Sequence, residues 1–221
     1  MSGNSRFISS AQTGVHPDLE KLVRRHMAHP FQKPIADYNR EAFALALAAR
    51  AQWQSDAPLI LDAGCGVGWS TQRIAETYPD HFVFGVDQSV DRISRGKPLP
   101  MPANAKLIRA DLVDFWRLLA GNGIRLARHY NLYPNPWPKI GHLARRWQGH
   151  AVLPVWLALG GEVECRSNWQ IYIEEMAFAL SLLSGTQVAS EPWQTDNPMT
   201  PFEKKYQESG HELWRCRVSL P

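Results

Sequence analysis

Short apolar runs alternate along this chain with longer stretches in which apolar residues recur at helical spacing. The runs predict strands at residues 58–62, 82–86, 105–110, 128–133 and 161–166, and a last strand within 212–219. Helices are expected between them at 69–78, 89–95, 112–120, 169–183 and near 147–159, where Pro154 marks a kink or a boundary. This alternation predicts an α/β fold with a doubly wound, mostly parallel sheet and a late antiparallel strand.

The first 50 residues follow a different pattern. Residues 1–16 contain Ser, Gly and Asn without apolar periodicity and are expected to be loose. A short basic helix is expected at 17–27 and a longer, alanine-rich helix at 38–53. We therefore predict an N-terminal extension over residues 1–50 and a second domain over 51–221. In an open α/β sheet, ligands bind outside the carboxyl ends of the strands.

Composition narrows the class of protein. The 221 residues, 44% of them hydrophobic, suffice for one full core. No run approaches the length of a membrane span, and the N-terminus lacks the apolar region of a secretory signal. Three widely spaced cysteines argue against a disulfide framework and a zinc site, so we expect no metal and a reducing, cytoplasmic compartment. Basic clusters at 24–26, 139–146 and 204–205 suit a polyanion, although solvated helix faces would look similar.

The first predicted strand ends in Asp62 and leads into Gly64, Gly66 and Gly68. Glycines at every second position allow a tight turn and a close approach to a ligand, and the next helix offers its free N–H groups. The spacing departs from the dinucleotide fingerprint, because Trp69 occupies the place of the third glycine. It resembles motif I of class I methyltransferases that use S-adenosylmethionine (SAM). A glycine-rich structural turn is the alternative.

Two further acids follow the next two strands. Asp87 ends the second strand roughly 20 residues after the glycines, where a carboxylate can accept two hydrogen bonds from a ribose diol. Asp111 follows the third strand, and an acid there commonly lies near the adenine amino group in the SAM-dependent superfamily. A single Asp at a strand end is more often a helix cap. Three acids at three successive strand ends are better explained by one cleft.

The segment after the fourth predicted strand, Tyr133-Pro-Asn-Pro-Trp-Pro-Lys139, leads into a basic stretch that ends in Arg145 and Arg146. Its three prolines restrict the backbone, so its side chains are held in place at a small entropic cost on binding. A rigid loop with a polar residue, an indole and a trailing basic stretch can grip a base beside its phosphates. A plain proline-rich turn is the alternative.

This loop resembles the signature of the bacterial tRNA (guanine-N7)-methyltransferases, roughly F-P-D-P-W-P-K-x-R-H-x-K-R-R. The family's T-D-W has its counterpart in residues 167–169, its T-x-F-E in 200–203 and its G-H-x-x-W in 210–214. The resemblance spans residues 58–218. It implies a Rossmann-like class I methyltransferase domain over 51–221, SAM as cofactor and tRNA as partner. The resemblance leaves open whether the protein is a monomer or a homodimer.

The resemblance also assigns individual residues. Asn135 stands where the family has the aspartate taken as its active-site residue, so it is the candidate catalytic residue. Asn135 and Asn168 replace two family aspartates, Gly141 replaces an arginine, and Asp62 replaces a glutamate. The expected cofactor contacts are Asp62, Gly64, Gly66, Gly68, Asp87, Asp111 and Asn135. The expected substrate contacts are Lys139, Arg145, Arg146, Asn168, Thr200, Phe202 and Glu203.

Three hypotheses about function follow. The first is SAM-dependent methyl transfer to N7 of a guanine in tRNA, with the variable-loop guanine implied by the family. The second transfers the methyl group to an exocyclic amine of a base, because Asn135-Pro-Trp is close to the [DNS]-P-P-[YFW] motif of amine methyltransferases. The third is a non-catalytic relative that binds SAM or RNA, since the two asparagines lack the charge of the aspartates they replace.

Overall fold

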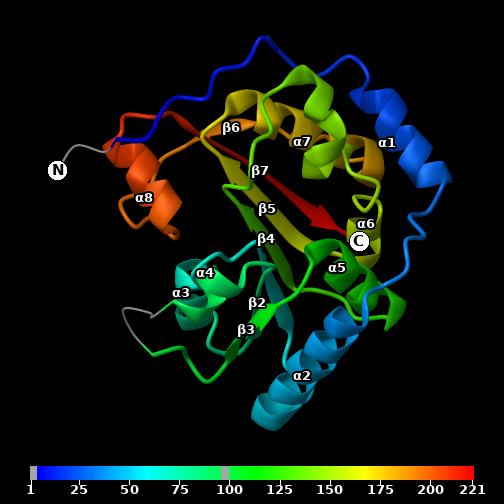
Figure 1. The fold of residues 1–221 in the computed structure, drawn as a ribbon, viewed down its shortest axis with the longest axis vertical. Coiled ribbons are helices and arrows are strands. Elements are labelled where there is room, and N and C mark those ends of the chain that lie inside the picture. The colour runs from blue at the N-terminus through cyan, green and yellow to red at the C-terminus, as the bar shows by residue number, and fades with distance from the viewer. Residues whose placement is uncertain (1–3, 96–99) are drawn as a thin grey trace.

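A seven-stranded sheet forms the centre of the computed structural model, which describes residues 4–95 and 100–221 (Figure 1). The strand order is β3-β2-β1-β4-β5-β7-β6. The strands from β1 to β5 are parallel, whereas β7 runs antiparallel to both β5 and β6. The strands are β1 (Leu59–Ala63), β2 (Phe82–Asp87), β3 (Ala105–Arg109), β4 (Arg128–Leu132), β5 (Gly161–Ser167), β6 (Glu191–Trp193) and β7 (Leu213–Leu220).

The predicted fold class is confirmed, including the late antiparallel strand, and each predicted strand is present within two residues of its expected bounds. The short strand β6 was not predicted. The helices are α1 (Leu19–Ala28), α2 (Asp37–Gln54), α3 (Trp69–Thr77), α4 (Val90–Ser94), α5 (Leu112–Gly121), α6 (Val155–Leu159), α7 (Gln170–Ser184) and α8 (Pro201–Glu208). Two 3₁₀ helices, η1 (Ile140–Arg145) and η2 (Trp147–Gly149), precede α6.

The prediction of one continuous helix over 147–159 is wrong, whereas the boundary expected at Pro154 is confirmed, because α6 begins at Val155. The chain forms η2, then turns, and only then α6. The ring nitrogen Nδ1 of His150 accepts a hydrogen bond from the Val152 N–H at 3.1 Å, which closes a turn. Pro154 is the residue before α6 and has no N–H to continue a helix from residue 147. The helix α8 was not predicted either, although Thr200 caps it and Pro201 occupies its first turn.

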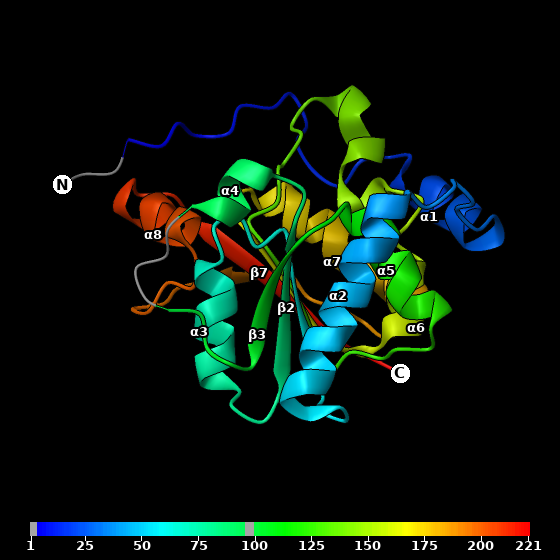
Figure 2. The same ribbon diagram turned by 60° about the horizontal axis from the view of Figure 1, so that its bottom comes forward.

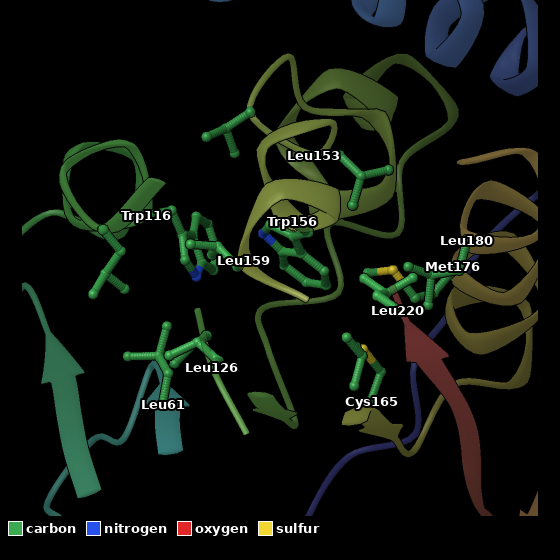
Figure 3. Close-up of a cluster of buried hydrophobic side chains, with 14 of the residues drawn as sticks. Leu61, Trp116, Leu126, Leu153, Trp156, Leu159, Cys165, Met176, Leu180 and Leu220 are labelled. Carbon is green, nitrogen blue, oxygen red and sulfur yellow. The ribbon is translucent and has the colours of Figure 1, made fainter. Parts of the chain in front are cut away.

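The side chains of the central strands alternate between two apolar layers. Leu59 and Leu61 face one cluster, which includes Phe115 of α5, whereas Ile60 faces a second cluster with Ile74 of α3. Helices therefore cover both faces of the sheet, with α3 on one side and α2 and α5 on the other (Figure 2). The larger cluster contains the fully buried indoles of Trp116 and Trp156, together with Leu159 (Figure 3).

The segment that precedes α1 was expected to be loose, but the structure ties its described part to the body of the protein. It runs from the neighbourhood of α8 to α1 (Figure 1). The ring of Phe7 stacks on His211 with 4.2 Å between centroids, and Ser10 Oγ donates to the Pro138 carbonyl at 2.6 Å. Helices α1 and α2 contribute Leu19 and Phe43 to the larger cluster. A domain boundary at residue 50 stays a prediction.

Across residues 4–95 and 100–221, no helix is both long and apolar enough to cross a membrane. The three cysteines are buried and unbridged. No group of three or more His, Cys, Asp or Glu side chains in this part of the chain could hold a metal ion.

Candidate functional site

A cleft of about 700 Å³ opens at the carboxyl ends of β1, β2 and β4. Its walls come from the loop after β1, the end of β2, the start of α5, the loop after β4 and the start of α8. These segments are far apart in the sequence, and the sheet topology brings them to one edge. The predicted site residues that line the cleft are Gly64, Gly66, Asp87, Asp111, Asn135, Arg145, Thr200 and Phe202.

The glycine loop after β1 has the backbone conformation that its sequence predicts. Gly64, Gly66 and Gly68 have φ values of 78°, 58° and 84°, in the left-handed region that other residues rarely adopt. A Cβ atom built on Gly64 or Gly66 would meet no heavy atom within 4 Å. Backbone conformation, and not packing, therefore requires these two glycines, and the space beside them is open to a ligand. Gly68 is the residue that precedes α3 and does not line the cleft.

Asp87, at the end of β2, holds the glycine loop in place. Its Oδ2 accepts a hydrogen bond from the Gly66 N–H at 3.0 Å, and its Oδ1 accepts one from the Ser89 N–H at 2.8 Å. Arg92 adds an ion pair at 3.5 Å. A carboxylate has about four acceptor sites, so Asp87 can still accept from hydroxyl groups in the cleft.

Asp111 has two roles. Its Oδ1 accepts a hydrogen bond from the Val113 N–H at 2.8 Å, which caps α5, and the residue also lines the cleft. Its backbone N–H donates to Asn39 Oδ1 at 2.9 Å, so helix α2 fixes this corner of the cleft. Asp111 therefore both caps a helix and borders the cleft.

Asp62, an expected cofactor contact, forms hydrogen bonds within the protein. The side chain is 1% exposed and lies beneath the loop, where its Oδ2 accepts from the hydroxyls of Ser70 and Thr71 at 2.6 Å each. Asp62 is not among the residues that line the cleft. Burial raises its pKa to about 6, although the two hydroxyls oppose the shift. On the strand, Asp62 faces α3 like Ile60, and it fixes the start of that helix.

The loop after β4 contains two residues with strained backbones. Tyr133 and Trp137 have φ values of 52° and 46°, and such conformations cost of order 1–3 kcal/mol each unless the surroundings enforce them. The Tyr133 N–H donates to the Arg166 carbonyl at 2.8 Å. The Trp137 indole lies under the exposed guanidinium of Arg145, 4.9 Å from the ring centroid. Between the two strained positions, Asn135 is exposed and borders the cleft.

Arg146, an expected substrate contact, does not line the cleft. Its side chain is fully buried, and its Nη1 forms an ion pair with Glu175 Oε2 of α7 at 2.7 Å. Its Nε donates to the Trp137 carbonyl at 3.1 Å, and its Nη2 donates to the Lys139 carbonyl at 3.3 Å. Arg146 therefore holds the loop from within. The side chain of Lys139 is exposed and does not line the cleft.

Glu203, another expected substrate contact, does not line the cleft either. Its carboxylate is fully buried and accepts from the Tyr133 hydroxyl at 2.8 Å, from Arg166 Nη1 at 2.9 Å and from Trp193 Nε1 at 2.8 Å. Burial and this carboxylate raise the pKa of Tyr133, so Tyr133 stays a neutral donor. Glu203 thus supports the strained loop. Thr200, by contrast, accepts from the Glu203 N–H and still lines the cleft.

Asn168 lies outside the cleft. Its Nδ2 donates to His211 Nδ1 at 3.0 Å, and the other ring nitrogen of His211 donates to the Ser5 carbonyl at 3.2 Å. His211, just before β7, therefore joins Asn168 to the segment before α1. A substrate contact at Asn168 stays a prediction.

Among the cleft-lining residues that the sequence did not indicate are Asn131 and Trp147. Asn131, in β4, lines it with only 1% of its surface exposed. The half-buried Trp147 lines it as well, and its ring packs edge-on against Trp116 at 4.8 Å. The available signal for Asn131 was an amide near the end of the predicted strand 128–133.

A family model described as a putative methyltransferase matches residues 56–216. The tRNA (guanine-N(7)-)-methyltransferase of Acidovorax sp. (strain JS42) is 32% identical over 215 residues, which cover 91% of this chain and 79% of that protein. The enzyme of the same name from Geobacillus kaustophilus (strain HTA426) is 26% identical over 191 residues, which cover 78% of this chain and 85% of that protein.

Solved structures share the fold. A 16S rRNA (adenine(1408)-N(1))-methyltransferase variant from Catenulisporales acidiphilia, solved with its cosubstrate SAM, matches with a TM-score of 0.54 at 19% identity. The match covers 85% of this chain and 94% of that chain. An antibiotic-related methyltransferase matches with a TM-score of 0.53 at 14% identity, over 85% of this chain and 96% of that chain.

Proposed function

The chain belongs to the family of tRNA (guanine-N(7)-)-methyltransferases, and from this premise we propose that it transfers the methyl group of SAM to N7 of a guanine in tRNA. One observation carries the proposal. The glycine loop, Asp87 and the rigid loop after β4 line the same cleft, so a cofactor site and an acceptor site adjoin. The relatives named for this reaction match most of the length of the chain, which supports the choice of acceptor.

The residues of the cleft fit SAM. Asp87 has acceptor capacity left for the ribose hydroxyls, and the open space beside Gly64 and Gly66 admits a ligand close to the backbone. Asp111 borders the cleft at the start of α5, at a place suited to the adenine amino group. When bound, SAM supplies an electrophilic methyl group on a sulfonium.

The protein's contribution to the reaction is alignment and charge stabilisation. Guanine N7 carries an in-plane lone pair and no proton, so its attack needs no general base. The amide oxygen of Asn135 can accept a hydrogen bond from guanine N1–H or from the 2-amino group. The side chain of Phe202 is 48% exposed at the mouth of the cleft and can stack on a base.

The exposed guanidinium of Arg145 lies at the same mouth and suits an RNA phosphate. We assign the methyltransferase activity to residues 51–221 and treat residues 1–50 as an extension that packs on this domain. The variable-loop guanine is the target that the family implies. A tRNA substrate places the enzyme in the cytoplasm.

Incubation of the purified protein with an unmodified tRNA transcript and methyl-labelled SAM tests the proposal. Nucleoside analysis by mass spectrometry should show 7-methylguanosine. An Asp87→Ala variant should lose the product, whereas Asp80→Ala, which changes an exposed carboxylate before β2, should keep it. Label in N6-methyladenosine or N4-methylcytidine would instead indicate methyl transfer to an exocyclic amine of a base. Calorimetric binding of SAM without any product would indicate a non-catalytic relative.

A further inference from the structure

One amide in the cleft has an unsatisfied hydrogen-bond donor. Asn131 is the next-to-last residue of β4, between Ala63 of β1 and Cys165 of β5. Its Nδ2 is buried and has no hydrogen-bond partner among residues 4–95 and 100–221, and the residue lines the cleft. An unsatisfied buried donor lowers stability, and native proteins rarely keep one without a reason. A ligand that accepts from this amide would supply that reason.

The strand order says which part of a ligand reaches Asn131. Neighbouring strands follow the order β3, β2, β1 and β4 along the sheet edge. Asp111 follows β3, Asp87 ends β2, and the glycine loop follows β1, so the adenine and ribose places lie over the first two strands. A SAM molecule laid along this edge has its amino-acid end over β1 and β4. Asn131 is the polar side chain that β4 offers there.

The chemistry of that end leaves one suitable acceptor. The amino-acid end of SAM carries a sulfonium, an ammonium and a carboxylate. An N–H donor is repelled by the two cations and forms a charge-assisted hydrogen bond with the carboxylate. We propose that Asn131 is a cofactor-binding residue whose Nδ2 donates to the carboxylate of the amino-acid end of SAM. This inference rests on the proposed function for the identity of the cofactor.

The proposal predicts opposite effects on stability and on binding. Replacement of Asn131 by leucine keeps the branched shape and removes the unsatisfied donor. Thermal unfolding of the ligand-free Asn131→Leu variant should therefore occur at the same or a higher temperature than that of the wild type. Its affinity for S-adenosylhomocysteine should fall by about ten- to a hundredfold, because a hydrogen bond to a charged group is lost.

Calorimetry with two ligands tests which group Asn131 contacts. S-adenosylhomocysteine has the amino-acid end, whereas 5′-methylthioadenosine has the nucleoside and sulfur without it. The Asn131→Leu variant should bind the first ligand more weakly and the second with wild-type affinity. Asn131→Ala, which cannot overfill the site, should give the same pattern. Asn104→Leu is the matched control. Asn104 precedes β3, at the opposite end of the strand from the cleft, and its Nδ2 donates to the carbonyls of Ala75, Tyr78 and His81.

The control variant should unfold at a lower temperature and bind both ligands as the wild type does. An equal loss for both ligands at Asn131 would overturn the proposal, as would unchanged affinity for S-adenosylhomocysteine. A wild-type protein that binds neither ligand would overturn the proposed function together with this inference. A wild-type protein that binds S-adenosylhomocysteine but makes no 7-methylguanosine would overturn the choice of acceptor and leave this test intact.

Discussion

Arg146 and Glu175 form an ion pair from which solvent is excluded, with 2.7 Å between Nη1 and Oε2 and no exposed surface on either side chain. The same guanidinium donates to the carbonyl of Trp137, so the pair connects helix α7 to the loop after β4. Gln12 joins the pair, because it accepts from Arg146 and donates to Glu175. The loop that borders the acceptor side of the cleft is thus held by charges buried behind it.

Removal of one partner of this pair should destabilise the whole fold. Arg146→Ala leaves the Glu175 carboxylate buried without a counter-charge, and we expect a loss of about 3–5 kcal/mol in the free energy of unfolding. Urea denaturation at pH 7, followed by circular dichroism, measures this. Arg24→Ala is the control, because Arg24 pairs with Glu20 on the surface of α1 and its loss should change stability little. A loss at Arg146 no larger than that of the control would contradict the buried pair.

Arg145 should act on RNA and not on stability. Its guanidinium is exposed at the mouth of the cleft, so Arg145→Ala should weaken tRNA binding and lower the slope of log affinity against log salt by about one. Filter binding over a series of salt concentrations measures both quantities. Arg217→Ala removes an exposed arginine of β7 outside the cleft and should leave the slope unchanged. Identical slopes for the Arg145 variant and the wild type would exclude a phosphate contact.

Asn135→Asp should accelerate methyl transfer. A carboxylate at this exposed position of the cleft can accept from the guanine and stabilise the positive charge that grows on the purine. A charge-assisted hydrogen bond exceeds a neutral one by about 1 kcal/mol, which corresponds to roughly five- to tenfold in rate. Single-turnover formation of 7-methylguanosine is the measurement. Asn168→Asp makes the same change outside the cleft and should have little effect; an equal gain from both variants would argue against a specific role of position 135.

Asp62 should make the stability depend on pH below neutrality. Burial raises its pKa to about 6 in the folded protein, from an ordinary value near 3.8. The folded state therefore holds the proton more tightly, so this contribution to stability is complete below about pH 4 and is lost as the pH rises through about 6. A rise of about two in pKa corresponds to roughly 3 kcal/mol in the free energy of unfolding.

Asp62→Asn removes the titration and keeps an oxygen that can accept from Ser70 and Thr71. Urea denaturation of both proteins from pH 4 to pH 7 should show a difference that grows in favour of the variant with rising pH. A difference that stays constant over this range would show that Asp62 does not titrate there.

Residues with local roles were predictable from the sequence. Gly64 and Gly66 adopt left-handed conformations that glycine favours. Asp87 ends a strand that its apolar run predicts. The parallel topology then requires these strand ends to meet at one edge, so a cleft with a nucleotide loop followed from the pattern. Of the helix expected near 147–159, only the part after Pro154 is an α-helix, because proline has no N–H with which to continue a helix from residue 147.

Residues whose roles depend on distant partners were not predictable. Arg146 and Glu203 belong to residue types that are rarely buried, and each is buried because an opposite charge lies next to it. Their partners stand 29 and 37 positions away in the sequence. Asn168 stands at the aspartate position of a family motif, but its side chain hydrogen-bonds to His211 and does not line the cleft.

The sequence alone determined the alternation of most strands and helices, the glycine turn and the family, because these follow from local spacing and from motifs that are contiguous in the chain. Only the tertiary structure decided which polar side chains face the cleft and which are buried behind it. That choice depends on which oppositely charged or hydrogen-bonding groups the folded sheet and helices bring within about 3 Å of one another, and contacts between remote residues leave no local pattern in the sequence.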